Sequence, residues 1–386
     1  MNKVSRSENK KAGQSLLIVI CSLLIGFFCS GCSQSERTWK PGIPIAKEKI
    51  KIAVIYPNNI NMNSYYDNAH NEGILEMQQK IGLEDSQIVR KENVFDGDSG
   101  VVEGVMRDCI AEGANIIFST TFGYMDVCEK LAAEFPLVIF IQTLGTKHNN
   151  YNFANISTKL YQARYLSGIV AGLRTRTRKI GYVAALGKDS SEVTSGINAF
   201  AIGVEEVNPE ARIYVKVTYS WFDAMGETDA ANALIAAGCD VIAAHCNTAQ
   251  PQTTAEKAGV WSIGFNTDMS TIAPDSVISS VVPNWGIIYT RLVESIINGS
   301  FKPAAYFLGL TEGAIDITPL KRELAPPGAS EAVFAARQRI LSGGFNVFDG
   351  VLETNDGRIL GEAGKTLPDD VILGGIDWYY RTVLEF

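Results

Sequence analysis

Aromatic and short polar side chains recur where the predicted strands end, and their types suit the binding of a flat organic molecule. The residues concerned are Tyr65, Tyr66, Phe122, Tyr124, Trp221, Phe222, Asn247, Asn266, Asp268 and Trp285. Aromatic rings stack on planar ligands, and each offset pair contributes about 0.5–1.5 kcal/mol beyond burial. Amides and carboxylates discriminate among ligands, because a mismatched buried polar group costs about 1–3 kcal/mol. We therefore predict a binding site for a neutral, hydrogen-bonding ligand.

Each of these residues also has a simpler interpretation. Tyr65, Phe122 and Trp221 could each pack in a core or an interface. Asn266 and Asp268 could cap helices. Their joint placement at one predicted edge of a sheet is what favours a ligand site. Lys147 and Lys188 are the only basic residues near these loops, so phosphorylated ligands are disfavoured.

Signals for catalysis are weak. Residues 97–100 read Gly-Asp-Ser-Gly, as in part of a serine-protease nucleophile loop, but they stand in an acidic turn before a predicted helix. The histidines are His70, His148 and His245, and none is spaced from another as metal ligands are. We predict a protein that is not an enzyme and that has no catalytic residue, no metal site and no cofactor.

Residues 1–31 have the pattern of a secretory signal. A basic start precedes an apolar run over residues 16–28, and Ser30 and Gly31 then lead to Cys32. This ending resembles the lipobox of bacterial lipoproteins, in which the cysteine is acylated, although Cys29 stands where leucine is usual. An uncleaved membrane anchor is the alternative, but the apolar run is too short to span a bilayer comfortably. The sequence predicts an extracytoplasmic protein held to a bacterial membrane by lipid on Cys32.

The composition is that of an acidic globular protein. The chain has 386 residues, 46% of them hydrophobic, and a formal charge of −8, which falls to −11 when a leader carrying +3 is removed. No Lys/Arg-rich stretch follows the leader, which argues against nucleic acid as a partner. We expect Cys109, Cys128, Cys239 and Cys246 to be buried free thiols, with a Cys239–Cys246 bridge left open.

Short β-branched runs alternate with longer amphipathic segments, as in α/β proteins with parallel sheets. Strands are predicted at 49–57, 115–120, 137–142, 179–186, 212–219, 240–245 and 261–265, and helices at 67–81, 125–135, 160–174 and 192–207. The chain also repeats itself, since residues 110–119 and 235–244 match in residue type at nearly every position. Gly113 and Gly238, which are 125 residues apart, then cap equivalent helices.

Two Rossmann-like lobes follow from this repeat. We predict a tether at 32–48, a first lobe at 49–158 plus 277–304, and a second lobe at 159–276 plus 305–386. Hinges are predicted near 157–160, 269–276 and 304–308. A ligand would bind between the lobes, at the carboxyl ends of the strands. A turn at Asn355-Asp356-Gly357 predicts a hairpin, and Trp378 to Tyr380 could cover one lobe.

From about Ile50 onward the chain resembles the basic membrane protein family of substrate-binding lipoproteins. The blocks that carry the resemblance are residues 69–73 (AHNEG), 122–126 (FGYMD), 161–172 (YQARYLSGIVAG), 179–185 (KIGYVAA), 196–200 (GINAF), 220–223 (SWFD) and 264–269 (GFNTDM). The family also includes purine nucleoside receptors, so the resemblance implies a type I periplasmic-binding-protein clamshell. It places the chain nearest a subgroup associated with purine bases such as adenine.

The resemblance also implies roles for individual residues. Tyr65 stands where relatives have an aromatic that stacks on the base, and Trp221 or Phe222 would supply the opposite face. Asn266 and Asp268 stand where nucleoside-binding relatives contact ribose.

Two departures from the family pattern concern the choice of ligand. Asn61, Met62 and Asn63 replace an acidic residue, and Pro283 or Asn284 replaces a lysine of the nucleoside binders. The second change favours a free base over a nucleoside.

The combined prediction is a monomeric lipoprotein that captures a purine, preferably adenine, guanine or hypoxanthine as the free base, for an ABC permease. One alternative is a sugar or autoinducer receptor on the same fold, because aromatic rings also stack on pyranoses. The other is a ligand-gated sensor partner, in which the closed form docks on a membrane receptor.

Overall fold

The computed structural model of the chain describes residues 40–60 and 64–386. The described elements belong to one compact unit within residues 39–386. The predicted signal peptide with Cys32, most of the predicted tether, and residues 61–63 lie outside the described residues. In the described ranges, no helix combines the length and the apolar character that crossing a membrane requires.

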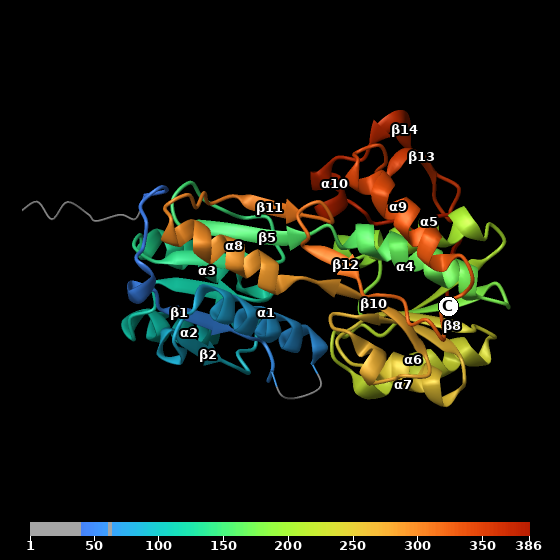
Figure 1. Ribbon diagram of the computed structural model, residues 1–386, viewed down its shortest axis with the longest axis horizontal. Coiled ribbons are helices and arrows are strands. Elements are labelled where there is room, and N and C mark those ends of the chain that lie inside the picture. The colour runs from blue at the N-terminus through green and yellow to red at the C-terminus, as the bar shows by residue number, and fades with distance from the viewer. Residues whose placement is uncertain (1–39, 61–63) are drawn as a thin grey trace, which may run out of the picture. The chain divides into compact units, whose positions relative to one another are not determined.

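The first sheet is parallel, with the strand order β11-β5-β4-β3-β1-β2 among the described residues (Figure 1). Its strands are β1 Ile52–Ile55, β2 Ile88–Lys91, β3 Ile116–Ser119, β4 Ile139–Thr143, β5 Phe153–Thr158 and β11 Ala305–Leu308. Helices α1 Tyr65–Ile81 and α8 Trp285–Ile297 cover one face, and α2 Ser99–Ala111 and α3 Met125–Glu134 cover the other. Successive residues of β1 point to opposite faces, so Ile52 and Ala53 belong to different apolar clusters.

The second sheet has the order β12-β10-β9-β8-β6-β7-β15, in which only β12 is antiparallel to its neighbour. Its strands are β6 Lys179–Ala184, β7 Arg212–Val217, β8 Val241–His245, β9 Trp261–Phe265, β10 Val277–Pro283, β12 Ile315–Ile317 and β15 Val383–Glu385. Helices α4 Leu160–Arg174 and α5 Ser191–Val207 cover one face, and α6 Ala224–Ala236 and α7 Gln250–Lys257 cover the other.

The two sheets repeat one strand order, which confirms the internal repeat of the sequence. The run β2-β1-β3-β4-β5 in the first sheet corresponds to β7-β6-β8-β9-β10 in the second. In each sheet a glycine with positive φ ends the helix before the third strand of this run, Gly113 at +96° and Gly238 at +92°. Only glycine adopts this conformation without strain, so the matched glycines mark equivalent turns. The predicted pair of Rossmann-like lobes is confirmed.

The chain passes between the sheets in three places, and two of them differ from the expected positions. The first passage lies between β5 and α4, at Lys159, as expected. The sequence placed residues 277–304 with the first lobe, but β10 pairs with β9 in the second sheet. It placed residues 305 onward with the second lobe, but β11 pairs with β5 in the first. Strand pairing is a long-range property that an apolar run does not reveal.

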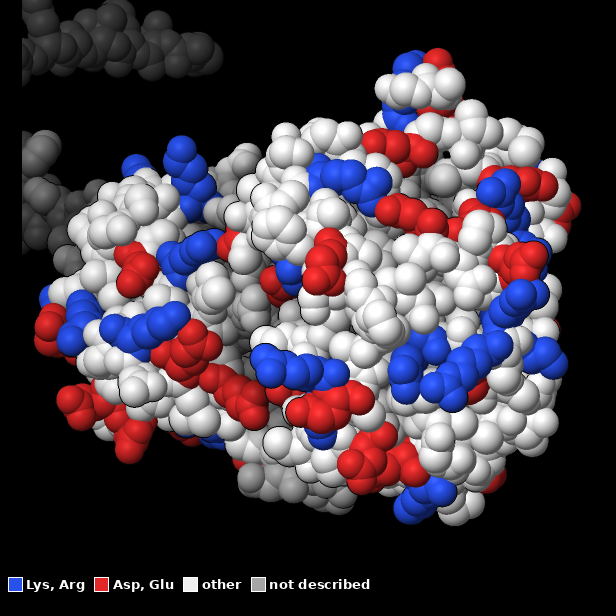
Figure 2. Space-filling model, turned by 45° about the vertical axis from the view of Figure 1, so that its right-hand side comes forward, with Lys and Arg blue, Asp and Glu red and all other residues white. Residues whose placement is uncertain are grey.

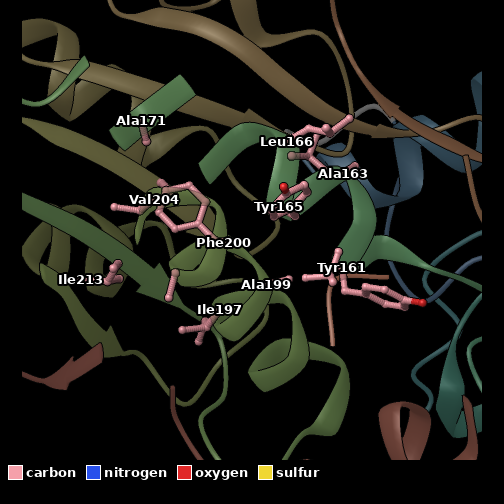
Figure 3. Close-up of a cluster of buried hydrophobic side chains, with 14 of the residues drawn as sticks. Tyr161, Ala163, Tyr165, Leu166, Ala171, Ile197, Ala199, Phe200, Val204 and Ile213 are labelled. Atoms are coloured by element: carbon pink, nitrogen blue, oxygen red, sulfur yellow. The ribbon is translucent and has the colours of Figure 1, made fainter. Parts of the chain in front are cut away.

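Helices α4 and α5 pack closely through glycines in the core of the second lobe (Figure 3). A Cβ atom at Gly168 of α4 would lie 2.1 Å from the carbonyl oxygen of Phe200. A Cβ atom at Gly203 of α5 would lie 2.2 Å from the carbonyl oxygen of Tyr165. Both distances are far below van der Waals contact, so each position requires glycine. The glycines of residues 168–172 therefore serve helix packing and not phosphate binding.

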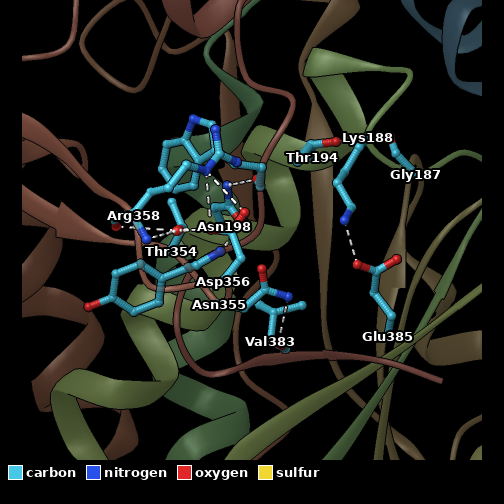
Figure 4. A network of polar contacts seen from close by, with 12 residues as sticks. Gly187, Lys188, Thr194, Asn198, Thr354, Asn355, Asp356, Arg358, Val383 and Glu385 are labelled. Carbon is cyan, nitrogen blue, oxygen red and sulfur yellow. Dashed lines mark hydrogen bonds and ion pairs between the residues drawn. The ribbon is translucent and has the colours of Figure 1, made fainter.

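The C-terminal segment is built onto the second lobe. It contains α9 Ala329–Leu341, the hairpin of β13 Asp349–Glu353 and β14 Ile359–Thr366, α10 Asp369–Gly374, and β15 on the edge of β7. The side chain of Asn198 on α5 donates to the carbonyl of Trp378 at 2.8 Å and accepts from the amide of Tyr380 at 2.8 Å (Figure 4). Both aromatic residues are buried, so this segment covers the lobe as the sequence indicated.

The surface charges and the state of the cysteines agree with what the sequence indicated. Lys and Arg side chains lie interspersed with Asp and Glu on the face shown in Figure 2. Cys109, Cys128, Cys239 and Cys246 are buried free thiols, as predicted, and the bridge between the last two is not formed.

Candidate functional site

A cavity of about 480 Å³ lies at the carboxyl ends of the strands and is lined from both lobes. This volume is within the range of about 300–1,000 Å³ that is usual for small-molecule sites. The lining residues are Phe122, Leu144, Gly145, Thr146, Ser157, Thr158, Leu160, Tyr161, Leu186, Asp189, Ser190, Ser191, Glu192, Ser195, Trp221, Phe307, Ile372, Leu373 and Gly374. Most of them are apolar or carry hydroxyl groups, and no Lys or Arg is among them.

Two predicted aromatic residues, Phe122 and Trp221, reach this cavity from different lobes. Phe122 begins the short helix that follows β3 and is 61% exposed, while Trp221 follows β7 and is 37% exposed. The Trp221 ring meets the imidazole of His245 edge-on, with 5.8 Å between ring centroids. Both rings are therefore accessible to a ligand in the cavity.

Tyr65 and Asn247 join the two lobes beside the cavity. The backbone amide of Tyr65 donates to the carbonyl of Asn247 at 2.9 Å. The Tyr65 ring packs against a small apolar cluster of the second lobe that includes Ala249 and Met269, and partial burial raises the pKa of its phenol. Neither Tyr65 nor Asn247 is among the residues that line the cavity.

Asn266 and Asp268 are positioned differently from each other. Asn266 is buried with a positive φ of 69°, and its Nδ2 has no hydrogen-bond partner within the described residues. Asn tolerates this backbone conformation better than other non-glycine residues, and such conformations are common at ligand sites. Asp268 is exposed, and its carboxylate accepts from the amide of Ser270 at 2.9 Å. Asp268 therefore caps a short helix.

Tyr124 is buried in the first lobe, and Tyr66 is half-buried there. The Tyr66 hydroxyl donates to the carbonyl of Thr120, and the Tyr124 hydroxyl donates to the carbonyl of Val94. Burial, with a contribution from the charge of Glu192, raises the pKa of Tyr66 well above its usual range. Tyr66 therefore lies close enough to the second lobe for the charge of Glu192 in that lobe to raise its pKa.

Trp285 and Phe222 lie apart from the cavity lining. Trp285 is buried at the start of α8, where its ring stacks on His70 with 4.2 Å between centroids. Its backbone also contacts Gly73 of α1 so closely that a Cβ there would lie 2.5 Å from the Trp285 Cβ. Phe222 is partly exposed beside Trp221. Trp285 thus joins α1 to α8 inside the first lobe.

The start of α5 supplies polar groups to the cavity. Ser190 caps the helix through the amide of Val193, and Glu192 follows in the first turn. The Glu192 Oε1 lies 3.9 Å from Nε2 of His245. Burial raises the pKa of Glu192 to about 7 against the opposing charge of Arg164, whereas burial lowers the pKa of His245 well below its usual range. His245 is therefore neutral at physiological pH.

Within residues 40–60 and 64–386, no group of three or more His, Cys, Asp and Glu side chains is arranged to hold a metal ion. The histidines at 70 and 245 are instead buried among aromatic rings. The cavity can stack a planar ligand and exchange hydrogen bonds with it through hydroxyls and a carboxylate.

Several lining residues were not among the predicted site residues. Leu144 to Thr146 and Leu186 to Glu192 follow β4 and β6, so the expectation of ligands at strand ends leads to them as well. Ile372, Leu373 and Gly374 come from α10, far along the chain, and no local signal connects them to the cavity.

Comparison with known proteins agrees with this arrangement. Residues 49–334 match the Bmp family, described as ABC transporter substrate-binding protein, PnrA-like. A purine-binding protein of Brucella abortus is 31% identical over 92% of this chain and 96% of its own length. A putative ABC transporter glucose-binding protein of Haloferax volcanii is 34% identical over 61% of this chain and 59% of its own length.

A solved ABC transporter solute-binding protein from Conexibacter woesei shares the fold. It superposes with a TM-score of 0.63 at 21% identity, over 77% of this chain and 98% of its own chain.

Proposed function

Since this chain belongs to the Bmp family of PnrA-like ABC transporter substrate-binding proteins, we propose that it captures a purine in the cavity between its lobes. The observation that carries the proposal is the presence of Phe122 and Trp221, from opposite lobes, at one cavity that also contains the carboxylate of Glu192. A planar, nitrogen-rich ring matches this combination of stacking surfaces and hydrogen-bonding groups. The purine-binding relative, which the chain matches along nearly its whole length, supports the same ligand class.

The free base is favoured over the nucleoside. A lysine that would contact ribose in nucleoside binders is replaced by Pro283 or Asn284. Pro283 lies in β10, and the side chain of Asn284 is engaged with the carbonyl of Gly313 at 2.8 Å. Of the two other candidates for a ribose contact, Asp268 is engaged in capping, and Asn266 remains with an Nδ2 that has no partner among the described residues. Fewer groups are therefore available to a sugar than to a base.

The proposal includes an anchor and a partner. Cys32 would be acylated after cleavage at residue 31, so the binding unit would work outside the cytoplasm on a membrane surface. The lobes would close on the ligand by a hinge motion at the passages between the sheets, and the closed form would deliver the purine to an ABC permease. No chemical step is involved.

Analysis of the ligand that copurifies with the protein tests this proposal. The full chain would be purified in detergent, and small molecules released from it would be identified by mass spectrometry. The stripped protein would then be titrated with adenine, guanine, hypoxanthine and their nucleosides by calorimetry. A near-stoichiometric free base with micromolar or tighter affinity is expected. A nucleoside would contradict the preference for the base, and failure to bind any purine would contradict the ligand class.

A sugar is the second candidate, because the Haloferax relative is named as a putative glucose-binding protein. Aromatic rings also stack on pyranoses, and the serines that line the cavity could bind hydroxyl groups. Competition of pentoses and hexoses against a bound purine separates the two. Displacement by a sugar at micromolar concentration would favour this second function.

A further inference from the structure

Arg164 is a fully buried arginine directly beneath the wall of the cavity. It belongs to α4, one turn after Leu160 and Tyr161, which line the cavity. Its guanidinium lies 4.2 Å from the ring centroid of Phe265 and 5.5 Å from that of Tyr182. Within the described residues, none of its three side-chain nitrogens has a hydrogen-bond partner. A buried cation without such partners is costly, and this favours a functional role over a purely structural one.

Arg164 packs against α5 at Gly196, one turn after Glu192. A Cβ atom at Gly196 would lie 3.5 Å from Cγ of Arg164, 3.8 Å from its Nε and 3.5 Å from Nδ1 of His245. Glu192 is four residues before Gly196, so both lie on the same face of the helix. Arg164 and His245 therefore approach the helix face that presents Glu192 to the cavity.

The charged and titratable groups around Glu192 come from four elements. Arg164 of α4 lowers the pKa of Glu192, while burial raises it. His245 of β8 is neutral, the half-buried Tyr66 of α1 has a pKa that the charge of Glu192 helps to raise, and Asp189 lies on the loop before α5. Arg164 is the only cation in this set. Glu192 also has no hydrogen bond or ion pair within 3.5 Å among the described contacts of its side chain, and this residue lines a ligand-sized space.

We propose that Glu192 is the carboxylate that binds the N–H donors of the ligand, and that Arg164 is a positioning residue that keeps this carboxylate ionised toward the cavity. The inference deepens the proposed function and rests on it. An ionised carboxylate only accepts hydrogen bonds, so the ligand must present an exocyclic amine or a ring N–H to this wall. The ligand class is thus a nitrogen heterocycle bound through its donor edge.

Calorimetry on the full chain in detergent, with adenine and guanine as probes, tests the role of Glu192. Glu192→Gln is expected to weaken the binding of the tighter-binding probe at least tenfold, because charge-assisted hydrogen bonds are about twice as strong as neutral ones. Glu331→Gln, an exposed glutamate in the first turn of α9, is the matched control and should bind as wild type does. Binding by Glu192→Gln within threefold of wild type would overturn the inference and leave the proposed function standing.

The pH dependence of binding tests Arg164. Protonation of Glu192, whose pKa is raised by burial to about 7, removes the negative charge that strengthens its hydrogen bonds to the ligand, so wild-type affinity should fall as pH decreases from 8 to 6, and Glu192→Gln should show a flat profile. Arg164→Met should move the midpoint to higher pH, and Arg164→Lys should restore it. A wild-type profile that is flat between pH 6 and 8 would overturn the inference even if Arg164→Met does not fold. If wild type binds no purine, the proposed function fails and the inference fails with it.

Discussion

Phe122 and Trp221 are large apolar side chains that the fold leaves partly open at the cavity. Replacing either with alanine removes one stacking surface, so we expect Phe122→Ala and Trp221→Ala each to weaken purine binding about tenfold or more. Because neither ring is buried in a core, the unfolding temperature should change little. Titration calorimetry and thermal unfolding measure both quantities.

A matched control is available on the far side of the second lobe. Phe334 of α9 is 61% exposed, as Phe122 is, and does not line the cavity. Phe334→Ala should bind purines as wild type does. If Phe122→Ala and Trp221→Ala were as neutral as this control, stacking between the lobes would not be the basis of binding.

At the residue level, the sequence predicted the aromatic part of the cavity better than its polar part. Phe122 and Trp221 stand out because an aromatic residue after a buried strand is conspicuous in one dimension. Glu192 looks like an ordinary acidic residue in the first turn of a helix, where it favours the helix dipole. The role that we propose for Glu192 depends on Arg164, which packs from another helix against Gly196, one turn further along α5, and that juxtaposition arises only in the folded chain.

The stability of the second lobe depends on the close contact between α4 and α5. Gly203→Ala would place a Cβ about 2.2 Å from a backbone oxygen that cannot move without shifting α4. Overpacking of this kind costs typically about 1–3 kcal/mol. We expect Gly203→Ala to lower the free energy of unfolding by at least that amount, measured by urea denaturation.

Gly104 provides the control for that substitution. It lies inside α2, and a Cβ atom there would meet nothing within 4 Å. Gly104→Ala should raise the free energy of unfolding by up to about 1 kcal/mol, because alanine is the better helix former. If both substitutions changed the free energy of unfolding in the same direction, close packing would not explain the glycine at 203.

Helices were easier to predict than the passages between the lobes. The segment predicted at 160–174 agrees with α4, and the one predicted at 192–207 agrees with α5 to within one residue. Helical periodicity is local, so a short window of sequence is enough to show it. Residues 304–308 were predicted as a hinge but form β11, and the lobe to which β10 and β11 belong depends on partners more than 10 residues away in β9 and about 150 residues away in β5.

At the scale of the whole chain, attachment to the membrane depends on Cys32. We expect Cys32→Ser to prevent acylation and to move the protein from the membrane fraction to the soluble fraction, while purine binding is retained. Cys21→Ser, inside the apolar run of the leader, is the control and should leave the protein in the membrane fraction. Fractionation followed by immunoblotting measures the distribution. Retention of Cys32→Ser in the membrane fraction would argue for an uncleaved anchor.

The cavity also depends on the chain as a whole, because its wall includes residues beyond the matched family region of 49–334. Leu373 of α10 lines the cavity, and α10 is held in place on both sides. On one side, the Asp369 carboxylate pairs with Lys159, at a passage between the lobes, with 3.1 Å between Oδ2 and Nζ. On the other, the amide of Ile376 donates to the Ser191 hydroxyl at the start of α5, at 3.1 Å.

A larger side chain at Leu373 would therefore enter space that the ligand needs, because α10 cannot easily move away. We expect Leu373→Trp to weaken purine binding about tenfold or more, and to affect a nucleoside at least as strongly as a base, with the unfolding temperature close to that of wild type. Leu341→Trp, at a partly exposed position on α9 that does not line the cavity, should bind normally. Calorimetry on both variants measures these affinities. Unchanged affinity in Leu373→Trp would mean that the ligand binds without contacting α10, and that the C-terminal segment only covers the second lobe.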